Sequence, residues 1–220
     1  MQFSADRKAR IMIVDDHPMV REGMAMLINR EPDMHACCQA DQIEQALKAN
    51  RSCPHDIVIV DMTLEGFSGL EMMRRLKFEF PDLPVLILSM HAESIYAEPA
   101  LKAGACGYLM KQTATAELLR AIRQVLRGEL YVSDQMRTRM LKKSMGDAGN
   151  DSAINSLSPS ELEVLHLIGI GLGTSEIAER IARSVKTIES HKANIKKKLD
   201  LDSSGQLSKF AINFVSLGQL

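Results

Sequence analysis

The chain has 220 residues, a formal net charge of −1 and 45% hydrophobic residues, which suffices for one large domain or two small ones with separate cores. No segment approaches the roughly 20 apolar residues of a membrane-spanning helix, and the N-terminal stretch reaches acidic residues before any long apolar run. These features exclude a membrane protein and predict a soluble, cytoplasmic one. The four cysteines lack the C-x-x-C spacing of a zinc or redox site and predict free thiols in a reducing compartment.

Short apolar runs alternate with amphipathic helical stretches from Arg10 to about Gly128. Several of these runs are continuously apolar, as expected of strands that are covered on both faces. The alternation predicts an α/β domain over residues 8–128, built on a doubly wound, five-stranded parallel sheet. We expect strands at 11–14, 34–39, 56–60, 85–88 and 107–110, and helices at 19–30, 42–50, 68–79, 93–103 and 114–127.

The apolar periodicity fails between Tyr131 and Ile154, where the stretch KKSMGDAGNDSAIN is rich in Gly, Asn, Asp and Ser. This composition predicts a linker over residues 129–155. Only helical patterns follow it, which predicts a small all-α domain over residues 156–220.

Capping residues mark where the helices of this second domain begin. Ser158, Pro159 and Glu161 supply an N-cap, a first-turn proline and a capping-box glutamate, so a helix is expected from there to about residue 170. Thr174 can cap a second, short helix that runs through residue 181, and Ser184 a third that runs to about residue 199. The last predicted helix carries an apolar stripe that serves either the core or a dimer contact, formed by Leu207, Phe210, Ala211, Phe214 and Val215.

Polar residues follow four of the predicted strands. Asp15 and Asp16 come after the first strand, Asp61 after the third, Ser89 after the fourth and Lys111 after the fifth. The carboxyl ends of parallel strands share one edge of the sheet, so these side chains are expected to converge. Three carboxylates repel one another unless a cation neutralises them, and hard oxygen ligands suit Mg²⁺. The sequence therefore predicts a magnesium site.

A carboxylate beside Mg²⁺ and a lysine ammonium can attack a phosphoryl group, because the cations offset charge on the transferring oxygens. Asp61 is assigned as the nucleophile because it comes from the central strand, and Asp15 and Asp16 as metal ligands. The alternative is that these residues only cap strand ends, since aspartate is common in loops. Suitable residues at four of the five expected strand ends favour the site.

The third helix of the second domain, SVKTIESHKANIKKKLDL, is amphipathic and basic. Its predicted buried face is formed by Val185, Ile188, Ile195 and Leu199. Its opposite face contains Lys186, Ser190, Ala193 and Lys197, with Glu189 and Asn194 at the margins. Between residues 180 and 198, Glu189 is the one acidic residue. The basic side chains around it are those of Arg180, Arg183, Lys186, Lys192, Lys196, Lys197 and Lys198.

Such a basic patch is either a solvated helix face or a surface that binds nucleic-acid phosphates. A short helix, a tight turn and a longer basic helix together favour the second reading. They form a helix-turn-helix, whose second helix enters the DNA major groove.

The segments IMIVDDHPMVREGMAMLI, DIVIVDMTLEGFSGLE, VLILSMH and ALKAGACGYLMK resemble the receiver of the NarL/FixJ response regulators, over nearly all of residues 8–127. The resemblance implies a flavodoxin-like receiver that a partner histidine kinase phosphorylates on Asp61. It also implies Mg²⁺ bound by Asp15 or Asp16, by Asp61 and by the backbone carbonyl of Thr63.

The same resemblance implies that Lys111 contacts the phosphoryl group. Ser89 and Tyr108 would form the switch pair, in which the hydroxyl moves toward the phosphoryl group and the aromatic ring follows it inward. Taken alone, Tyr108 at a strand end is a half-buried packing residue.

Two positions depart from the receiver pattern. Glu65 stands where similar receivers carry proline, which predicts a more mobile loop after Asp61. Pro99 lies inside the expected fourth helix, where proline removes a backbone hydrogen bond and costs about 3 kcal/mol. We therefore expect that helix to be shortened or distorted.

Nearly all of residues 156–217 are similar to the LuxR-type DNA-binding domain. The resemblance implies that Glu189, Ser190 and Ala193 face the bases. It implies DNA-backbone contacts for Thr174, Ser184, Lys186, Thr187 and Lys197. Because Ser190 and Ala193 have little hydrogen-bonding reach, Glu189, which can accept from cytosine, and apolar contact with thymine are expected to carry part of the readout.

The leading hypothesis is a DNA-binding transcriptional regulator of a two-component system, not a dedicated enzyme. A sensor histidine kinase would phosphorylate Asp61, and release or dimerisation would then permit a homodimer to bind paired half-sites in double-stranded promoter DNA. One alternative is a Mg²⁺-dependent phosphatase that uses Asp61 as nucleophile; it is weakened by the lack of a D-x-D motif and of a cap domain. Another is an atypical regulator that binds DNA constitutively or answers a protein partner without phosphorylation.

Overall fold

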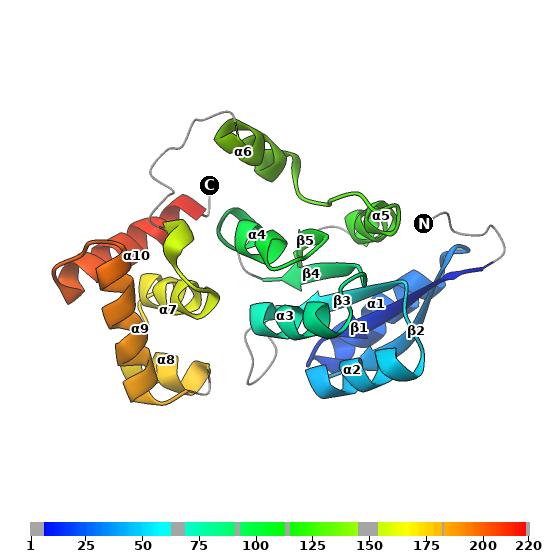
Figure 1. Ribbon diagram of the computed structural model, residues 1–220, viewed down its shortest axis with the longest axis horizontal. Helices are drawn as coiled ribbons and strands as arrows, with labels where there is room; N and C mark the ends of the chain where they lie inside the picture. The colour runs from blue at the N-terminus through cyan, green and yellow to red at the C-terminus, as the bar shows by residue number, and fades with distance from the viewer. Residues whose placement is uncertain are drawn as a thin grey trace. The chain divides into compact units, whose positions relative to one another are not determined.

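The computed structural model describes residues 7–62, 69–90, 93–112, 115–144, 154–181 and 183–218 (Figure 1). The chain divides into two compact units, Met1–Met136 and Arg137–Leu220. None of the helices in these described ranges combines the length and the apolar character that crossing a membrane requires.

The first unit is built on a sheet that, over the described residues, has five parallel strands in the order β2-β1-β3-β4-β5. Every residue of β3 and β4 is buried, as expected of central strands with helices on both faces. The order reverses beside β1, which is the signature of a doubly wound sheet. The prediction of the fold is therefore confirmed. The strands are β1 (Ala9–Val14), β2 (Met34–Ala40), β3 (Ile57–Asp61), β4 (Val85–Ser89) and β5 (Gly107–Met110).

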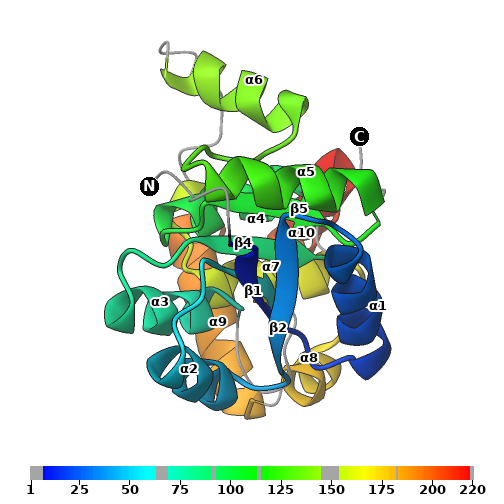
Figure 2. The ribbon, with the colours of Figure 1, turned by 90° about the vertical axis from the view of Figure 1, so that its right-hand side faces the viewer.

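Helices cover both faces of this sheet, and Figure 2 shows α1 and α2 on opposite sides of β1 and β2. The helices of the unit are α1 (Pro18–Asn29), α2 (Ile43–Ser52), α3 (Gly69–Glu79), α4 (Glu93–Lys102) and α5 (Thr115–Leu126). One face of the sheet packs against α1 and α5 in a single apolar cluster, because alternate strand residues point to the same side. That cluster includes Ile11, Ile13, Ile57, Ile59 and Leu86 from the strands and Ile28, Leu118, Ala121, Ile122 and Val125 from the helices.

The fourth helix differs from its prediction. It runs without interruption from Glu93 to Lys102, with Pro99 inside it, so the expected shortening is wrong. The helix continues past the proline, since the Ala103 N–H donates to the Pro99 carbonyl over 3.0 Å. Tyr96, Ala97 and Ala100 are buried, and this packing offsets the one hydrogen bond that proline cannot make. The other departure, Glu65, lies outside the described residues.

The start of the segment predicted as a linker packs on the sheet. Tyr131 forms a bridge with Gly107, and its carbonyl accepts from the Tyr108 N–H over 2.9 Å. A Cβ on Gly107 would lie 2.9 Å from the Tyr131 carbonyl oxygen, so this close approach requires glycine. A helix that the sequence analysis did not predict, α6 (Asp134–Ser144), follows.

The second unit is helical over its described residues, as predicted. Its elements are a short 3-10 turn (Ile154–Ser156), α7 (Pro159–Gly169), α8 (Thr174–Arg180), α9 (Val185–Lys198) and α10 (Ser204–Gly218). The predicted capping box at α7 is present: Ser158 Oγ accepts from the Glu161 N–H over 3.3 Å, and Glu161 Oε2 accepts from the Ser158 N–H over 2.6 Å. Ser184 caps α9 by accepting from the Thr187 N–H over 3.1 Å.

Two details of the second unit correct the sequence analysis. The N-cap of α8 is Gly173, one residue before the predicted Thr174, because the Glu176 carboxylate satisfies the Gly173 N–H over 2.7 Å. Val185, predicted on the buried face of α9, is 49% exposed, because it occupies the first turn of the helix.

The apolar stripe of α10 serves the core over part of its length. Leu207, Ala211 and Val215 are buried, and α10 packs against α7. A Cβ on Gly169 would lie 2.4 Å from the Ala211 carbonyl oxygen, so the two helices approach closely there.

Candidate functional site

The sheet brings three of the predicted pocket residues into direct contact. Asp15 follows β1, Asp61 ends β3 and Lys111 follows β5, where its N–H donates to the Ser89 carbonyl over 2.7 Å. The Lys111 ammonium lies 2.7 Å from Asp61 Oδ2 and 2.8 Å from Asp15 Oδ2. Asp15 is fully buried and Asp61 is 1% exposed. One cation therefore bridges two carboxylates that water hardly reaches.

The charge of Lys111 is sustained by these carboxylates. Burial alone would lower the pKa of Lys111, but hydrogen bonds and charge attraction from Asp15 and Asp61 outweigh burial and raise it. The ammonium form thus persists at neutral pH.

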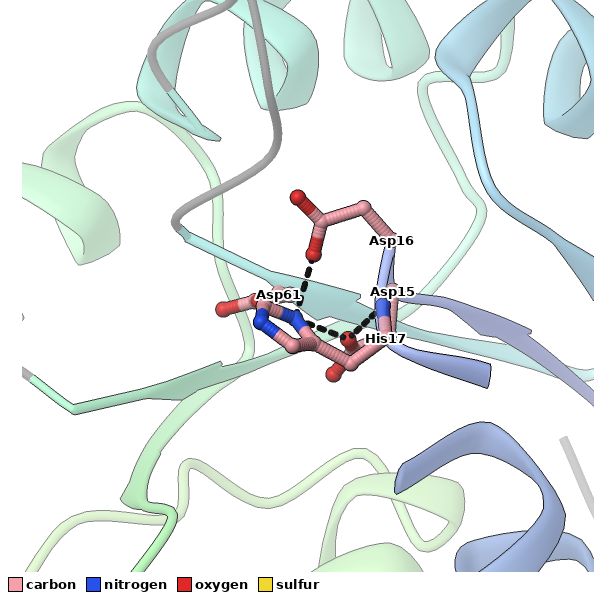
Figure 3. A group of neighbouring side chains, drawn as sticks. All are labelled: Asp15, Asp16, His17 and Asp61. Carbon is pink, nitrogen blue, oxygen red and sulfur yellow. Dashed lines mark hydrogen bonds and ion pairs between the residues drawn. The ribbon is translucent and has the colours of Figure 1, made fainter. Parts of the chain in front are cut away.

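Figure 3 shows Asp15, Asp16 and Asp61 converging with a fourth residue, His17, which the sequence analysis did not single out. His17 Nδ1 lies 2.6 Å from Asp16 Oδ1 and 3.3 Å from Asp15 Oδ1. The His17 N–H donates to Asp15 Oδ1 over 2.9 Å, and His17 is the N-cap of α1. Its position directly after two aspartates at a strand end is the signal that could have identified it.

The chemistry of this cluster fits a divalent cation. One ligand atom from each of Asp15, Asp16, His17 and Asp61 can be chosen so that all lie within 4.8 Å of one another. Carboxylate oxygens are the ligands that hard cations prefer. The fourth predicted ligand, the Thr63 carbonyl, lies outside the described residues.

The predicted switch residues lie on β4, which pairs with β3, and on β5, which pairs with β4. Ser89 ends β4 and Tyr108 lies in β5, and both are fully buried. The Tyr108 hydroxyl lies 3.9 Å from the Met62 sulfur. Burial raises the pKa of Tyr108, although a hydrogen bond with Ser89 acts in the opposite direction. The two hydroxyl groups therefore lie in the buried interior of the domain, and the tyrosine ring is turned inward.

In the second unit, the predicted reading helix is α9. Ile188 and Ile195 are fully buried, so the opposite face of α9 points toward solvent. The predicted DNA-contacting residues on that face are exposed: Lys186, Glu189, Ser190, Ala193 and Lys197. Ser184 is exposed as well, whereas Thr174 and Thr187 are partly covered.

Two lysines of the predicted basic patch are engaged within their own domain. Lys198 Nζ donates to Glu161 Oε2 over 2.7 Å and links the end of α9 to the start of α7. Lys192 Nζ donates to Thr174 Oγ1 over 2.8 Å and links α9 to α8. Sequence spacing could not separate these lysines from the others, because the contacts depend on how the helices cross.

Each of the two units matches a known protein family. Residues 11–123 match the response regulator receiver domain, and residues 155–211 match the bacterial regulatory proteins of the luxR family. The chain belongs to the response-regulator family.

Relatives of this response regulator match it over most of its length. It is 37% identical over 210 residues to the oxygen regulatory protein NreC of Staphylococcus carnosus (strain TM300), covering 92% of this chain and 96% of that one. It resembles RcsB from Salmonella enterica serovar Typhimurium, solved bound to promoter P1flhDC, with a TM-score of 0.65 at 25% identity, covering 93% of this chain and 98% of that one. A LuxR-family response regulator from Aurantimonas sp. SI85-9A1 gives a TM-score of 0.58 at 37% identity, covering 63% and 99%.

The response regulator is accordingly a transcription regulator of a two-component system, with a receiver domain and a LuxR-type DNA-binding domain. It is not a dedicated enzyme, so the phosphatase alternative is wrong. Its receiver carries an acidic pocket at the strand ends, formed by Asp15, Asp16 and Asp61.

Proposed function

We propose that this response regulator accepts a phosphoryl group on Asp61 from a sensor histidine kinase in the cytoplasm, and that the modification promotes binding of a homodimer to double-stranded promoter DNA. The observation that carries the proposal is the pair formed by Asp61 and Lys111, a nearly inaccessible carboxylate with an ammonium 2.7 Å away. Such a carboxylate can act as a nucleophile while the ammonium takes up charge on the incoming phosphoryl oxygens.

In the proposed transfer, a carboxylate oxygen of Asp61 bonds to phosphorus as the bond between phosphorus and the kinase histidine nitrogen breaks. Lys111 lies between Asp61 and Asp15 and can turn from a carboxylate to a phosphoryl oxygen without leaving the pocket. Asp15, Asp16, Asp61 and the Thr63 carbonyl would hold Mg²⁺, which when bound supplies positive charge to the transferring oxygens.

The proposed switch passes through Ser89 and Tyr108. The Ser89 hydroxyl would donate a hydrogen bond to a phosphoryl oxygen, and its hydrogen bond with Tyr108 would break. The tyrosine ring, buried in this structure, would keep its inward position in the phosphorylated form. The receiver would comprise residues 8–128, with residues 129–155 connecting it to the DNA-binding domain of residues 156–220.

The proposed DNA surface is the exposed side of α9 and its flanks. Glu189, Ser190 and Ala193 would face the bases in the major groove. The DNA backbone would be contacted by Thr174, Ser184, Lys186, Thr187 and Lys197. RcsB, which this chain resembles, was solved on promoter DNA in the presence of the phosphomimetic BeF₃⁻, and this supports coupling between phosphorylation and DNA binding.

The first experiment measures solution mass and affinity for random-sequence duplex DNA in one sample, with and without Mg²⁺ and BeF₃⁻. We expect the phosphomimetic to produce dimers that bind DNA more tightly, and Asp61→Asn to show neither change. Unchanged mass and affinity in the unmodified chain would contradict the phosphorylation switch and favour the atypical regulator that acts by other means.

A further inference from the structure

Three side chains of the DNA-binding domain meet where α8 begins and α9 passes its midpoint. Lys192 Nζ donates to Thr174 Oγ1 over 2.8 Å and to Glu189 Oε1 over 3.4 Å. The Lys192 side chain is 21% exposed, whereas that of Glu189 is 57% exposed. The lysine is therefore largely covered by the domain while the carboxylate projects toward solvent.

Glu189 is held by both of its neighbours. A hydrogen bond with the Thr174 side chain lowers the pKa of Glu189, and a hydrogen bond and charge attraction from Lys192 lower it further. The carboxylate is thus an ionised acceptor whose position is set by two helices. A side chain that is ordered before binding loses less conformational entropy when it contacts DNA.

The other two proposed base-facing residues offer little polar readout. The Ser190 hydroxyl donates to the Lys186 carbonyl over 3.0 Å, so its proton is used within the helix. Ala193 has no polar side-chain atom. Glu189 is then the main source of hydrogen-bond discrimination among these three positions.

A carboxylate in the major groove selects a base that presents a donor. Cytosine offers its N4 amino group, whereas adenine places the acceptor N7 beside its amino group, and guanine and thymine present acceptors at the corresponding positions. DNA phosphates repel a carboxylate, and the ammonium of Lys192 offsets part of this repulsion.

We infer that Lys192 is a positioning residue for base recognition: with Thr174 it holds the Glu189 carboxylate at a base edge, so that the regulator prefers cytosine at one position of each half-site. The inference rests on the proposed DNA binding. It assigns Lys192 a role different from that of Lys186 and Lys197, which are exposed on the same helix.

The test uses the full chain with Mg²⁺ and BeF₃⁻, and a pool of random duplexes from which the bound sequences are selected. Single-base variants of the selected duplex then give the base preference, and a salt titration gives the slope of log affinity against log salt. We expect the unmodified chain to prefer cytosine at one position by about fivefold or more. Lys192→Met should reduce this preference to below about twofold, with a nearly unchanged salt slope.

Two further variants separate positioning from general structural effects. Glu189→Gln should remove the cytosine preference, and adding Lys192→Met to it should change the preference no further, because the lysine acts through the carboxylate. Lys197→Met, which removes the same ammonium from the same helix, should lower the salt slope by about one and keep the preference. Thr174→Val removes the hydroxyl that contacts Lys192 and Glu189, and it should weaken the cytosine preference even if Lys192→Met fails to fold. Because Thr174 is also a proposed DNA-backbone contact, the base preference and not the overall affinity is the readout for this variant.

The outcomes distinguish this inference from the function on which it rests. If Lys192→Met keeps the cytosine preference and lowers the salt slope by about one, Lys192 contacts a phosphate and the inference is wrong, while DNA binding stands. If the unmodified chain selects no sequence, the proposed sequence-specific DNA binding itself fails.

Discussion

The receiver pocket and the exposed face of α9 use the same kinds of side chain in opposite surroundings. Asp15 and Asp61 are almost inaccessible and share one ammonium, whereas Lys186 and Lys197 project into solvent. Buried charges interact strongly with a few fixed partners, while exposed charges are screened by water and salt. Single substitutions should therefore have near all-or-none effects in the pocket and small, additive effects on the helix.

The largest effect is expected for Asp61→Asn. An amide cannot act as the nucleophile, so phosphoryl incorporation from a small phosphodonor such as acetyl phosphate should be abolished. Asp41→Asn, an exposed carboxylate between β2 and α2, is the matched control and should be labelled normally. Labelling of Asp61→Asn at the full rate would remove Asp61 from its proposed role.

Lys111→Met should lower the free energy of unfolding by about 3 kcal/mol without Mg²⁺, because it leaves two buried carboxylates without their counter-charge. Added Mg²⁺ should restore part of the loss if the pocket binds the ion. Urea unfolding followed by circular dichroism measures both values. The control is Lys102→Met, an exposed residue paired with Glu98, which should cost less than about 0.5 kcal/mol. Equal losses in the two variants would contradict the contrast between buried and exposed charges.

Glu161 is buried, but its partner Lys198 has a side chain that is 37% exposed, so an intermediate effect is expected. Glu161→Ala removes a capping box and the acceptor of Lys198, and should cost about 2 kcal/mol in urea unfolding. Glu176→Ala removes a cap at an exposed helix start and should cost less.

The pH dependence of the Glu161 contribution follows from its pKa. Burial alone would raise this pKa, but bonds from Lys198 and Ser158 lower it overall. A lowered pKa means that the stabilisation is present above the unfolded value of about 4.3 and is lost as the pH falls below it. The difference between the unmodified chain and Glu161→Gln should therefore shrink in acid, and a constant difference down to pH 3 would refute this origin.

The smallest effect is expected for Lys186→Ala. The exposed ammonium should contribute one phosphate contact, so affinity should weaken nearly uniformly across sequences and the salt slope should flatten by about one unit. Fluorescence anisotropy at several salt concentrations measures the slope. Lys209→Ala, an exposed lysine on α10, is the control and should leave the slope unchanged. An unchanged slope in Lys186→Ala would mean that no phosphate is contacted there.

Much of the fold followed from the sequence because local signals agreed with the global architecture. Apolar runs bounded by turn residues placed the strands, and the Ser158 capping box placed the start of α7. Pro99 was misjudged because a proline penalty is local, whereas the packing that offsets it is tertiary. The helix α6 was missed because its apolar periodicity is weak.

By itself the sequence determined the architecture, the order of the domains and the convergence of Asp15, Asp61 and Lys111, because the ends of parallel strands must share one edge. Only the tertiary structure decided that His17 joins that cluster and that Lys192 and Lys198 turn toward Thr174 and Glu161. The reason is that a strand end places a side chain through backbone geometry alone. The partner of a long, flexible side chain depends on which neighbouring helix lies within its reach.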